Sequence, residues 1–398
     1  MTAGARPATV RRPWRAPNEA LGALAQLGVS SLRGTATRIV QRGGGFGHHG
    51  APITTGPDRT VLLFYEDVEA DAFVRGDRHL ARGARRVYHA LTRGQQVSGF
   101  EIAFEALRTA LVRAGCRVVV NNHALARANP EHPVGLCGYP HVLDRWTLPN
   151  PAVLGPGLLD HPAVAPRLLD DPRFRAYLVP CDWMRGLFAP YYGDRLRLWF
   201  GGIDVEAWPD LAGAPKDIDL LVYDKIRWDR AVWEPALLRP VLAEARRRGL
   251  RVETLRRGAY GIDEYRALLG RSRGMLFLCE HETQGIAYQE AMASNVPILA
   301  WDPEQWLDPN RTRWTSARVP ASSVPYFDAS CGERFRDAAA FPAALDRFLT
   351  RLIEYAPRRY VRETLSLERS AALYLDTYTQ AARPVRWVTA RRGEAADD

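Results

Sequence analysis

The stretch from His281 to Asp302 constrains the fold of this 398-residue chain more than any other stretch. It reads HETQGIAYQEAMASNVPILAWD, with seven residues between Glu282 and Glu290. Gly285 lies at the start of a predicted helix, and the apolar run from Val296 to Ala300 predicts a buried strand after it. The first turn of a helix presents unpaired N–H groups and the positive end of its dipole. This stretch therefore suits a phosphate group.

The rest of the chain alternates between apolar runs and helical patterns. The apolar runs predict strands at 61–65, 117–121, 134–138, 152–155, 175–179, 195–200, 218–223, 251–255 and 275–279. Helical patterns occupy 101–114, 181–188, 232–248 and 262–269, one or two helices are expected within 335–355, and a last helical region covers 359–380. Such β-α-β units form parallel sheets, and a chain of this length is expected to hold two domains. The fold class is therefore α/β, with two Rossmann-like doubly wound sheets.

The glycine- and proline-rich segment 201–217 separates the two predicted domains. The predicted organisation is a disordered basic tail at 1–58, an N-terminal domain at 59–200 with a basic helical insertion at 70–95, a linker at 201–217, a C-terminal domain at 218–360, and a C-terminal helix with a frayed tail at 361–398. That last helix is a candidate for crossing back to the N-terminal domain.

Positive charge is concentrated near the start of the chain. The net charge is +9, and residues 1–60 hold eight arginines against Glu19 and Asp58. A second basic segment, 75–93, holds six arginines and one acid, with apolar residues along one helical face. A nucleic acid, an anionic membrane surface or simple solubility could each explain such charge. We expect a solvated tail, keep peripheral membrane contact as an alternative, and do not expect nucleic-acid binding.

The five cysteines, at 116, 137, 181, 279 and 331, show no close spacing typical of a metal or redox site. Most lie in apolar runs, so we predict buried, reduced thiols. No apolar run is long enough to span a membrane, and the N-terminus lacks the apolar core of a signal peptide. We therefore predict a cytoplasmic protein, with the inner membrane face as the alternative peripheral location.

The motif residues resemble the retaining, nucleotide-sugar-dependent glycosyltransferases of the GT-B fold (glycosyltransferase family 4, or group 1-like). In that family, two glutamates with seven residues between them flank a glycine-led helix that precedes a buried strand. Glu282, Gly285, the segment Glu290–Ala293 and Pro297 fit this pattern, while Asn295 stands where glycine is usual. The resemblance covers roughly residues 60–380.

Three weaker matches support the resemblance. Gly99 lies in a Gly-Phe-Glu sequence before a helix, like a glycine loop of the family's N-terminal domain. The sequence Gly-Gly-Ile-Asp from Gly201 resembles the family's interdomain turn. Lys225 and Arg230 follow a strand with four residues between them, where the family usually has arginine and then lysine. The swap keeps the charges but changes their geometry, because arginine is a planar fork and lysine a point charge. Arg227 is an alternative cation.

The resemblance implies a role for each of these residues. Glu282 is the catalytic candidate nearest the sugar, with a role in holding sugar hydroxyls. His141, in the sequence CGYPH after the strand at 134–138, is the candidate catalytic histidine, and His161 is the second choice. The donor-binding candidates are Lys225 and Arg230 for the phosphates, the N–H groups of Gly285 and Ile286, Glu290 for the ribose hydroxyls, and Gly99.

No Asp-x-Asp motif follows a strand, and no His/Cys cluster has ligand spacing, so we predict no metal and no cofactor. The implied co-substrate is a nucleotide sugar such as a UDP- or GDP-sugar. A glycan, a lipid-linked molecule or a small molecule would bind the N-terminal domain as acceptor. The alternatives are another GT-B enzyme, such as a sugar-nucleotide epimerase or a phosphorylase-like protein, or a basic binding protein without turnover.

Overall fold

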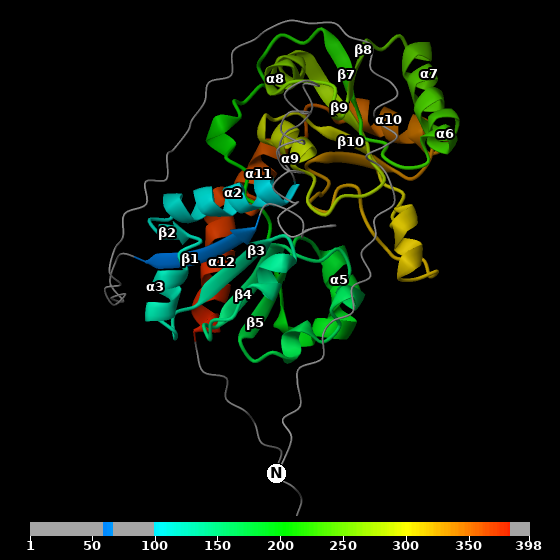
Figure 1. The fold of residues 1–398 in the computed structure, drawn as a ribbon. Helices are drawn as coiled ribbons and strands as arrows, with labels where there is room; N and C mark the ends of the chain where they lie inside the picture. The colour runs from blue at the N-terminus through cyan, green and yellow to red at the C-terminus, as the bar shows by residue number, and fades with distance from the viewer. Residues whose placement is uncertain (1–58, 67–98, 383–398) are drawn as a thin grey trace, which may run out of the picture. The chain divides into compact units, whose positions relative to one another are not determined.

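The computed structural model describes residues 59–66 and 99–382, which fall within one compact unit and form two parallel sheets (Figure 1). The first sheet has the strand order β2-β1-β3-β4-β5-β6, and the second has the order β11-β10-β9-β7-β8. Helices alternate with the strands along the chain. The predicted α/β fold with two Rossmann-like sheets is therefore confirmed. We call the first sheet with its helices the N-lobe and the second the C-lobe.

The central N-lobe strands, β1, β3, β4 and β5, are mainly apolar and largely buried, whereas the edge strands β2 and β6 are more exposed. The strands are β1 Thr60–Glu66, β2 Arg117–Val120, β3 Val134–Gly138, β4 Ala152–Gly157, β5 Phe174–Val179 and β6 Leu196–Leu198. The helices are α2 Gly99–Arg113, α3 His123–Ala128, α4 His141–Asp144 and α5 Asp182–Tyr192, with short 3-10 turns at Pro162–Val164, Leu168–Asp170 and Gly193–Arg195. All neighbouring strands pair in parallel, so their carboxyl ends meet at one edge of the sheet.

The C-lobe repeats this arrangement. Its strands are β7 Ile218–Asp224, β8 Val252–Arg256, β9 Ser272–Leu278, β10 Ile298–Trp301 and β11 Gly332–Phe335. Its helices are α6 Arg230–Trp233, α7 Arg239–Arg247, α8 Ile262–Arg271, α9 Ile286–Ala293, α10 Phe341–Thr350 and α11 Pro357–Thr364, with a π-helical turn at Glu234–Leu238 and 3-10 turns at Val205–Ala207 and Pro309–Arg313.

The C-lobe differs in two details from what its sequence predicts. The helix expected at 232–248 is divided by a π-helical turn, and it holds Pro235 and Pro240, neither of which can donate a backbone hydrogen bond. The region 335–355 holds one helix, as expected, but a short strand that was not predicted, β11, precedes it on the outer edge of the sheet. Its helix, α10, begins six residues later.

The last helix, α12 Leu367–Ala381, packs on the N-lobe (Figure 1). The hydroxyl of Tyr378 accepts a hydrogen bond of 2.9 Å from the N–H of Leu62 on β1. The indole N–H of Trp199 donates to the carbonyl of Ser370 at 3.1 Å. The preceding helix, α11, packs on α9 instead. The chain therefore returns from the C-lobe to the N-lobe between α11 and α12.

The turn from Gly201 to Asp204 is the first connection between the lobes, and it lies against the second, the segment between α11 and α12. The N–H of Ile203 donates to the carbonyl of Leu365 at 2.8 Å. A side chain at Gly202 would bring a Cβ within 2.7 Å of the Cα of Leu367, so only glycine allows this approach. Asp204 forms a bidentate ion pair with Arg113 at the end of α2. The two connections between the lobes are thus joined to each other.

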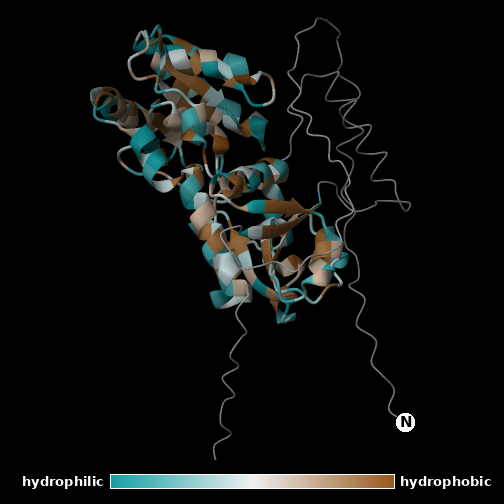
Figure 2. Ribbon diagram, turned by 90° about the vertical axis from the view of Figure 1, so that its left-hand side faces the viewer, coloured by the Kyte–Doolittle hydropathy of each residue, from teal (hydrophilic) through white to brown (hydrophobic). Residues whose placement is uncertain are grey.

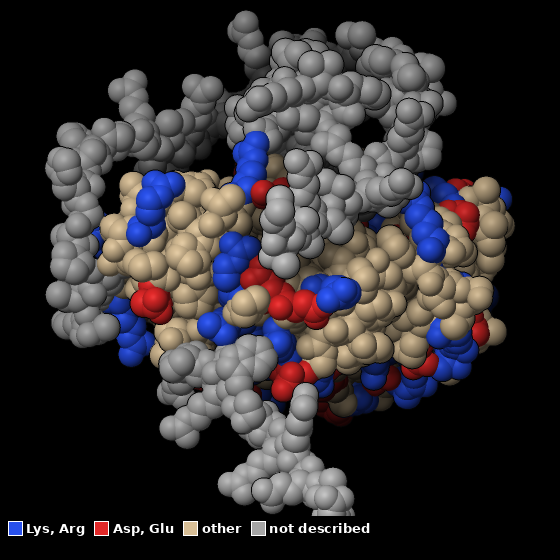
Figure 3. Space-filling view, turned by 60° about the horizontal axis from the view of Figure 1, so that its bottom comes forward, with Lys and Arg blue, Asp and Glu red and all other residues tan. Residues whose placement is uncertain are grey.

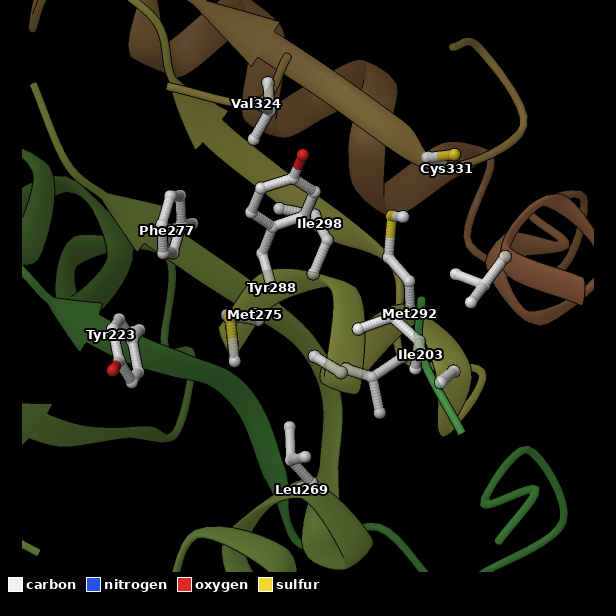
Figure 4. Close-up of a cluster of buried hydrophobic side chains, with 14 of the residues drawn as sticks. Ile203, Tyr223, Leu269, Met275, Phe277, Tyr288, Met292, Ile298, Val324 and Cys331 are labelled. Atoms are coloured by element: carbon white, nitrogen blue, oxygen red, sulfur yellow. The ribbon is translucent and has the colours of Figure 1, made fainter. Parts of the chain in front are cut away.

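The strands carry the most apolar residues (Figure 2). In the C-lobe, Tyr288 and Met292 on α9 point into a buried cluster that holds Phe277 on β9 and Ile298 on β10 (Figure 4). This packing fixes the position of α9 over the sheet. All five cysteines are buried and form no disulfide, as predicted.

Basic and acidic side chains are interspersed on the face shown in Figure 3. Among the described residues, several exposed arginines form ion pairs, such as Arg271 with Asp217 and Arg351 with Glu354, and such pairs contribute little stability. None of the helices within 59–66 and 99–382 could cross a membrane. The predicted tail at 1–58, the basic insertion at 70–95 and the frayed end after residue 382 lie outside the described residues, as does the predicted membrane contact that rests on them.

Candidate functional site

The candidate site lies where β7 and β9, neighbours in the C-lobe sheet, reach their carboxyl ends. Ligands of doubly wound sheets bind at such edges. Lys225 follows β7 directly, and Glu282 lies four residues after β9. The ammonium of Lys225 forms an ion pair with Oε1 of Glu282, and only 12% and 9% of the two side chains are exposed. The structure thus joins two of the predicted site residues.

The carboxylate of Glu282 is held in its charged form. Burial raises its pKa, but the charges of Lys225 and Arg227 and a hydrogen bond from Lys225 act in the opposite direction. The thiol of Cys279 also donates to Oε1 at 3.3 Å. The net result is a pKa below the ordinary value, so Glu282 is ionised at neutral pH.

The backbone around Glu282 is fastened to both lobes. The indole N–H of Trp183 on α5 donates to the carbonyl of Glu282 at 2.8 Å, and the N–H of Glu282 donates to Ser322 at 2.9 Å. Two residues on, the amide of Gln284 bonds the backbone of Gly201 in both directions: it accepts from the N–H at 2.9 Å and donates to the carbonyl. This loop therefore has little freedom to move alone.

Arg230, the second predicted phosphate ligand, already has a partner. Its guanidinium donates two hydrogen bonds, of 3.0 and 2.6 Å, to the carboxylate of Asp224. Asp224 is the last residue of β7 and only 3% exposed, and Glu234 lies 3.6 Å from the same guanidinium. A phosphate at Arg230 would share this cation with two carboxylates.

The loop between these cations is folded against the residues after β9. Arg227 donates to the carbonyl of His281 at 2.6 Å, and its guanidinium lies 4.1 Å from the ring centre of Trp228. The Trp228 ring stacks in turn on His281 at 5.0 Å. Burial lowers the pKa of His281 to about 3, so this imidazole is neutral and packs as an aromatic ring. The backbone of the loop is bonded to Glu280.

Helix α9 begins with a glycine in a left-handed conformation. Gly285 has φ +83°, and a Cβ there would clash with the ring of Tyr288. Ile286 is the first helical residue. Within the described part of the chain, no group accepts a hydrogen bond from the N–H of Gly285 or of Ile286. The start of α9 therefore keeps its capacity to bind an anion.

Glu290 lies on α9 in a different environment from Glu282. Burial raises its pKa to about 8, although the charge of Arg266 acts in the opposite direction. Its carboxyl group lies close enough to Tyr260 and Tyr265 to raise the pKa of both phenols. No hydrogen bond or ion pair joins it to another described residue. This largely buried acid is therefore free to accept hydrogen bonds from a ligand.

The histidine candidates belong to the N-lobe. His141 is the first residue of α4, and its Nε2 lies 3.1 Å from Oε2 of Glu66, the last residue of β1. Arg145 donates to the same oxygen at 3.0 Å. His141 is thus held at the carboxyl edge of the N-lobe sheet. Gly99 is the exposed first residue of α2, with open space around its Cα.

His161 is surrounded by aromatic rings. Its Nδ1 accepts a hydrogen bond of 3.1 Å from the N–H of Ala163, which caps a 3-10 turn. Its ring stacks on Trp314 at 4.9 Å, with an interplanar angle of 2°. Burial lowers its pKa. These contacts give His161 a packing role and favour His141 as the candidate that acts.

Sequence reasoning missed four residues that shape the site, namely Asp224, Glu280, Gln284 and Trp183. A signal was available for Asp224 and Glu280, because each is an acid at the carboxyl end of a buried strand. Gln284 and Trp183 act through backbone groups of distant segments, which no spacing reveals. In the described ranges, no three His, Cys, Asp or Glu side chains are grouped so that they could hold a metal ion.

No family model matches the chain, and no curated protein matches it. Among solved structures, it is similar to a glycosyltransferase from Rickettsia africae ESF-5, with 11% identity, a TM-score of 0.47, and coverage of 82% of this chain and 100% of that one. AviGT4, a glycosyltransferase involved in avilamycin A biosynthesis, has 13% identity, a TM-score of 0.45 and coverage of 81% and 98%. Sucrose-phosphate synthase from Thermosynechococcus elongatus has 13% identity, a TM-score of 0.47 and coverage of 81% and 99%. Similarities this low do not bear on function.

Proposed function

We propose that this protein is a retaining glycosyltransferase, which moves a sugar from a nucleotide-sugar donor to a glycan, a lipid-linked molecule or a small molecule. One observation carries the proposal. Lys225 is paired with the ionised Glu282 three residues before the open, glycine-led start of α9. A cation, a carboxylate and free N–H groups are the parts needed to hold a sugar diphosphate at a sheet edge.

The reaction places growing negative charge on a leaving diphosphate. Lys225 and the N–H groups of Gly285 and Ile286 would stabilise that charge, because they are oriented before the reaction begins. Without a ligand, Lys225 is paired with Glu282. When a diphosphate binds, the ammonium would interact with both the diphosphate and Glu282. We propose that Glu282 then accepts hydrogen bonds from the sugar hydroxyls. Arg230 would support the distal phosphate through the face that Asp224 leaves open.

Glu290 would bind the ribose. An ionised carboxylate can accept hydrogen bonds from both ribose hydroxyls, and Glu290 has no described partner to displace. The N-lobe would hold the acceptor, with His141 near the sugar and Gly99 at the donor. We propose a UDP- or GDP-sugar as the donor, without a metal or a cofactor. The five buried, reduced cysteines support a cytoplasmic location, and contact with the inner membrane face stays a prediction.

A panel of nucleotides and nucleotide sugars tests the proposal on the full chain. We expect one nucleoside diphosphate and its sugar to raise the melting temperature. With that sugar nucleotide, slow release of free sugar would indicate a transferase, whereas an epimerised nucleotide sugar would indicate an epimerase. The configuration of the released sugar's anomeric carbon, followed by NMR, tests retention. If no sugar nucleotide shifts the melting temperature, the donor site is wrongly assigned.

Glu282→Gln separates binding from turnover. We expect this variant to bind the nucleoside diphosphate but to lose most of its turnover, because its contact is with the sugar. Glu333→Gln is the matched control, since Glu333 on β11 is also a largely buried carboxylate paired with an arginine, Arg351. Equal turnover in the two variants would remove Glu282 from the mechanism.

A further inference from the structure

Glu280 is the most deeply buried carboxylate at the edge of the C-lobe sheet. It lies two residues after β9, and its side chain has no exposed surface. Its Oε1 accepts two hydrogen bonds, one of 2.7 Å from the N–H of Arg227 and one of 2.9 Å from the N–H of Trp228. Both donors are consecutive backbone groups of the loop after β7. Hydrogen bonds to a charged acceptor are about twice as strong as neutral ones, so this contact fixes the course of that loop.

Side chains of the same loop strengthen the attachment. Nη2 of Arg227 donates to the carbonyl of His281 at 2.6 Å, and its Nε lies 3.8 Å from Oε2 of Glu280. Trp228 stacks on the ring of His281. Oε2 itself makes no hydrogen bond in the described structure. Glu280 therefore acts mainly through Oε1. Its side chain must be long enough to bring this oxygen to the two N–H groups.

Lys225 begins this loop. Its N–H donates to the carbonyl of Leu278 at 2.8 Å, which continues the pairing of β7 with β9. After Lys225 the chain leaves that pairing, and two residues later the N–H of Arg227 donates to Glu280. The direction of the Lys225 side chain, and with it the ion pair to Glu282, depends on both attachments.

We propose that Glu280 is a positioning residue for the donor diphosphate. It holds residues 225–228 so that the ammonium of Lys225 meets the phosphates, without touching the donor itself. The inference rests on the proposed function of the site. Glu280 also occupies two N–H groups of a kind that could bind an anion directly. A role in repelling the diphosphate is therefore the opposite hypothesis, and it predicts tighter binding when the carboxylate is removed.

Two substitutions separate reach from charge. Glu280→Gln keeps an oxygen at the same distance but loses the charge, whereas Glu280→Asp keeps the charge but is one methylene too short for both N–H groups. Positioning predicts that Glu280→Asp weakens binding of UDP or GDP, whichever stabilises the wild type, by about tenfold, or ~1.4 kcal/mol. Glu280→Gln should stay within about threefold. The donor KM should rise more than kcat falls in Glu280→Asp.

Isothermal titration of each variant with the nucleoside diphosphate provides the measurement. Glu333→Asp is the control, because it shortens a carboxylate on β11 that accepts hydrogen bonds from Arg347 and Arg351. This variant should lose stability but not affinity. Weaker binding by Glu280→Gln than by Glu280→Asp, or unchanged or tighter binding by Glu280→Asp, would overturn the inference and leave the proposed function standing. A wild type that binds neither UDP nor GDP would overturn both.

Discussion

The two ends of one motif differ in their electrostatics. Glu282 is ion-paired to Lys225 and has a lowered pKa, while Glu290, eight residues on, has no described partner and a pKa raised to about 8. Both carboxyl groups are largely buried, so burial alone does not explain the difference. The cation supplied by the loop after β7 does, because it reaches Glu282 alone.

This contrast suggests a division of labour. A carboxylate that is already charged and paired can share its cationic partner with a diphosphate and turn to the sugar hydroxyls. An unpaired acid whose pKa lies near neutrality gains its charge most readily when hydroxyl donors arrive. Substitutions at and between the two glutamates should reveal this difference.

Lys225→Ala removes the cation that separates the two glutamates. We expect turnover to fall by about 10²–10³-fold, or roughly 3–4 kcal/mol, because one preorganised charge is lost from the leaving diphosphate. The pKa of Glu282 should rise towards that of Glu290, since only Arg227 and the Cys279 thiol are then left to oppose the effect of burial. Lys225→Arg is the control that keeps the charge. In a double-mutant cycle with Glu282→Gln, additive effects would show that the two residues act independently.

Gly285→Ala disturbs the start of α9, which lies between the two glutamates in the sequence. Alanine in a left-handed conformation costs about 1–2 kcal/mol, and its Cβ would also displace the ring of Tyr288. We expect the free energy of unfolding, measured with denaturant, to fall by at least this amount. Gly261→Ala is the matched control, because Gly261 precedes α8 with φ −95° and open space around it. Equal stability of the two variants would contradict the packing described for α9.

Glu290→Gln tests the raised pKa through pH dependence. Because the folded-state pKa exceeds the ordinary value, the stability linked to the proton is complete at low pH and is lost as pH rises through about 8. The melting temperature of Glu290→Gln should therefore gain on that of the wild type between about pH 5 and about pH 8.

Ligand binding should show the opposite trend. Wild-type affinity for the nucleoside diphosphate should increase over the same pH window as Glu290 ionises, while that of Glu290→Gln stays flat and about tenfold weaker at the upper end, or ~1.4 kcal/mol. Parallel pH profiles for the two proteins would show that Glu290 does not titrate in this range.

Trp183→Phe gives the smallest expected effect, because it removes one hydrogen bond to the backbone of Glu282. We expect a loss of about 0.5–1.5 kcal/mol in stability and a few-fold rise in donor KM. Trp199→Phe is the matched control, since its indole also donates to a carbonyl, that of Ser370, but away from the site. An equal change of KM in both variants would show that the effect comes from a general loss of stability and not from the contact of Trp183 with Glu282.

Much of the fold could be predicted because buried parallel strands are continuous apolar runs. The exception, β11, reads Gly-Glu-Arg-Phe, and its two charged residues conceal a strand that has only one neighbour. The resemblance of the motif to a known family likewise indicated Glu282, Gly285 and Glu290 as candidates. What spacing could not show is which carboxylate each cation meets. The pairing of Arg230 with Asp224 arises only once the chain is folded.

The bond between Gln284 and Gly201 has a mechanical consequence. Any movement that opens one lobe from the other must either break this two-way amide contact or carry residues 282–284 along with the N-lobe. The indole of Trp183 adds a second tether to the same three residues. The segment that holds Glu282 therefore links the two lobes. If a nucleotide leaves when the lobes separate, its release rate would depend on how often these hydrogen bonds break.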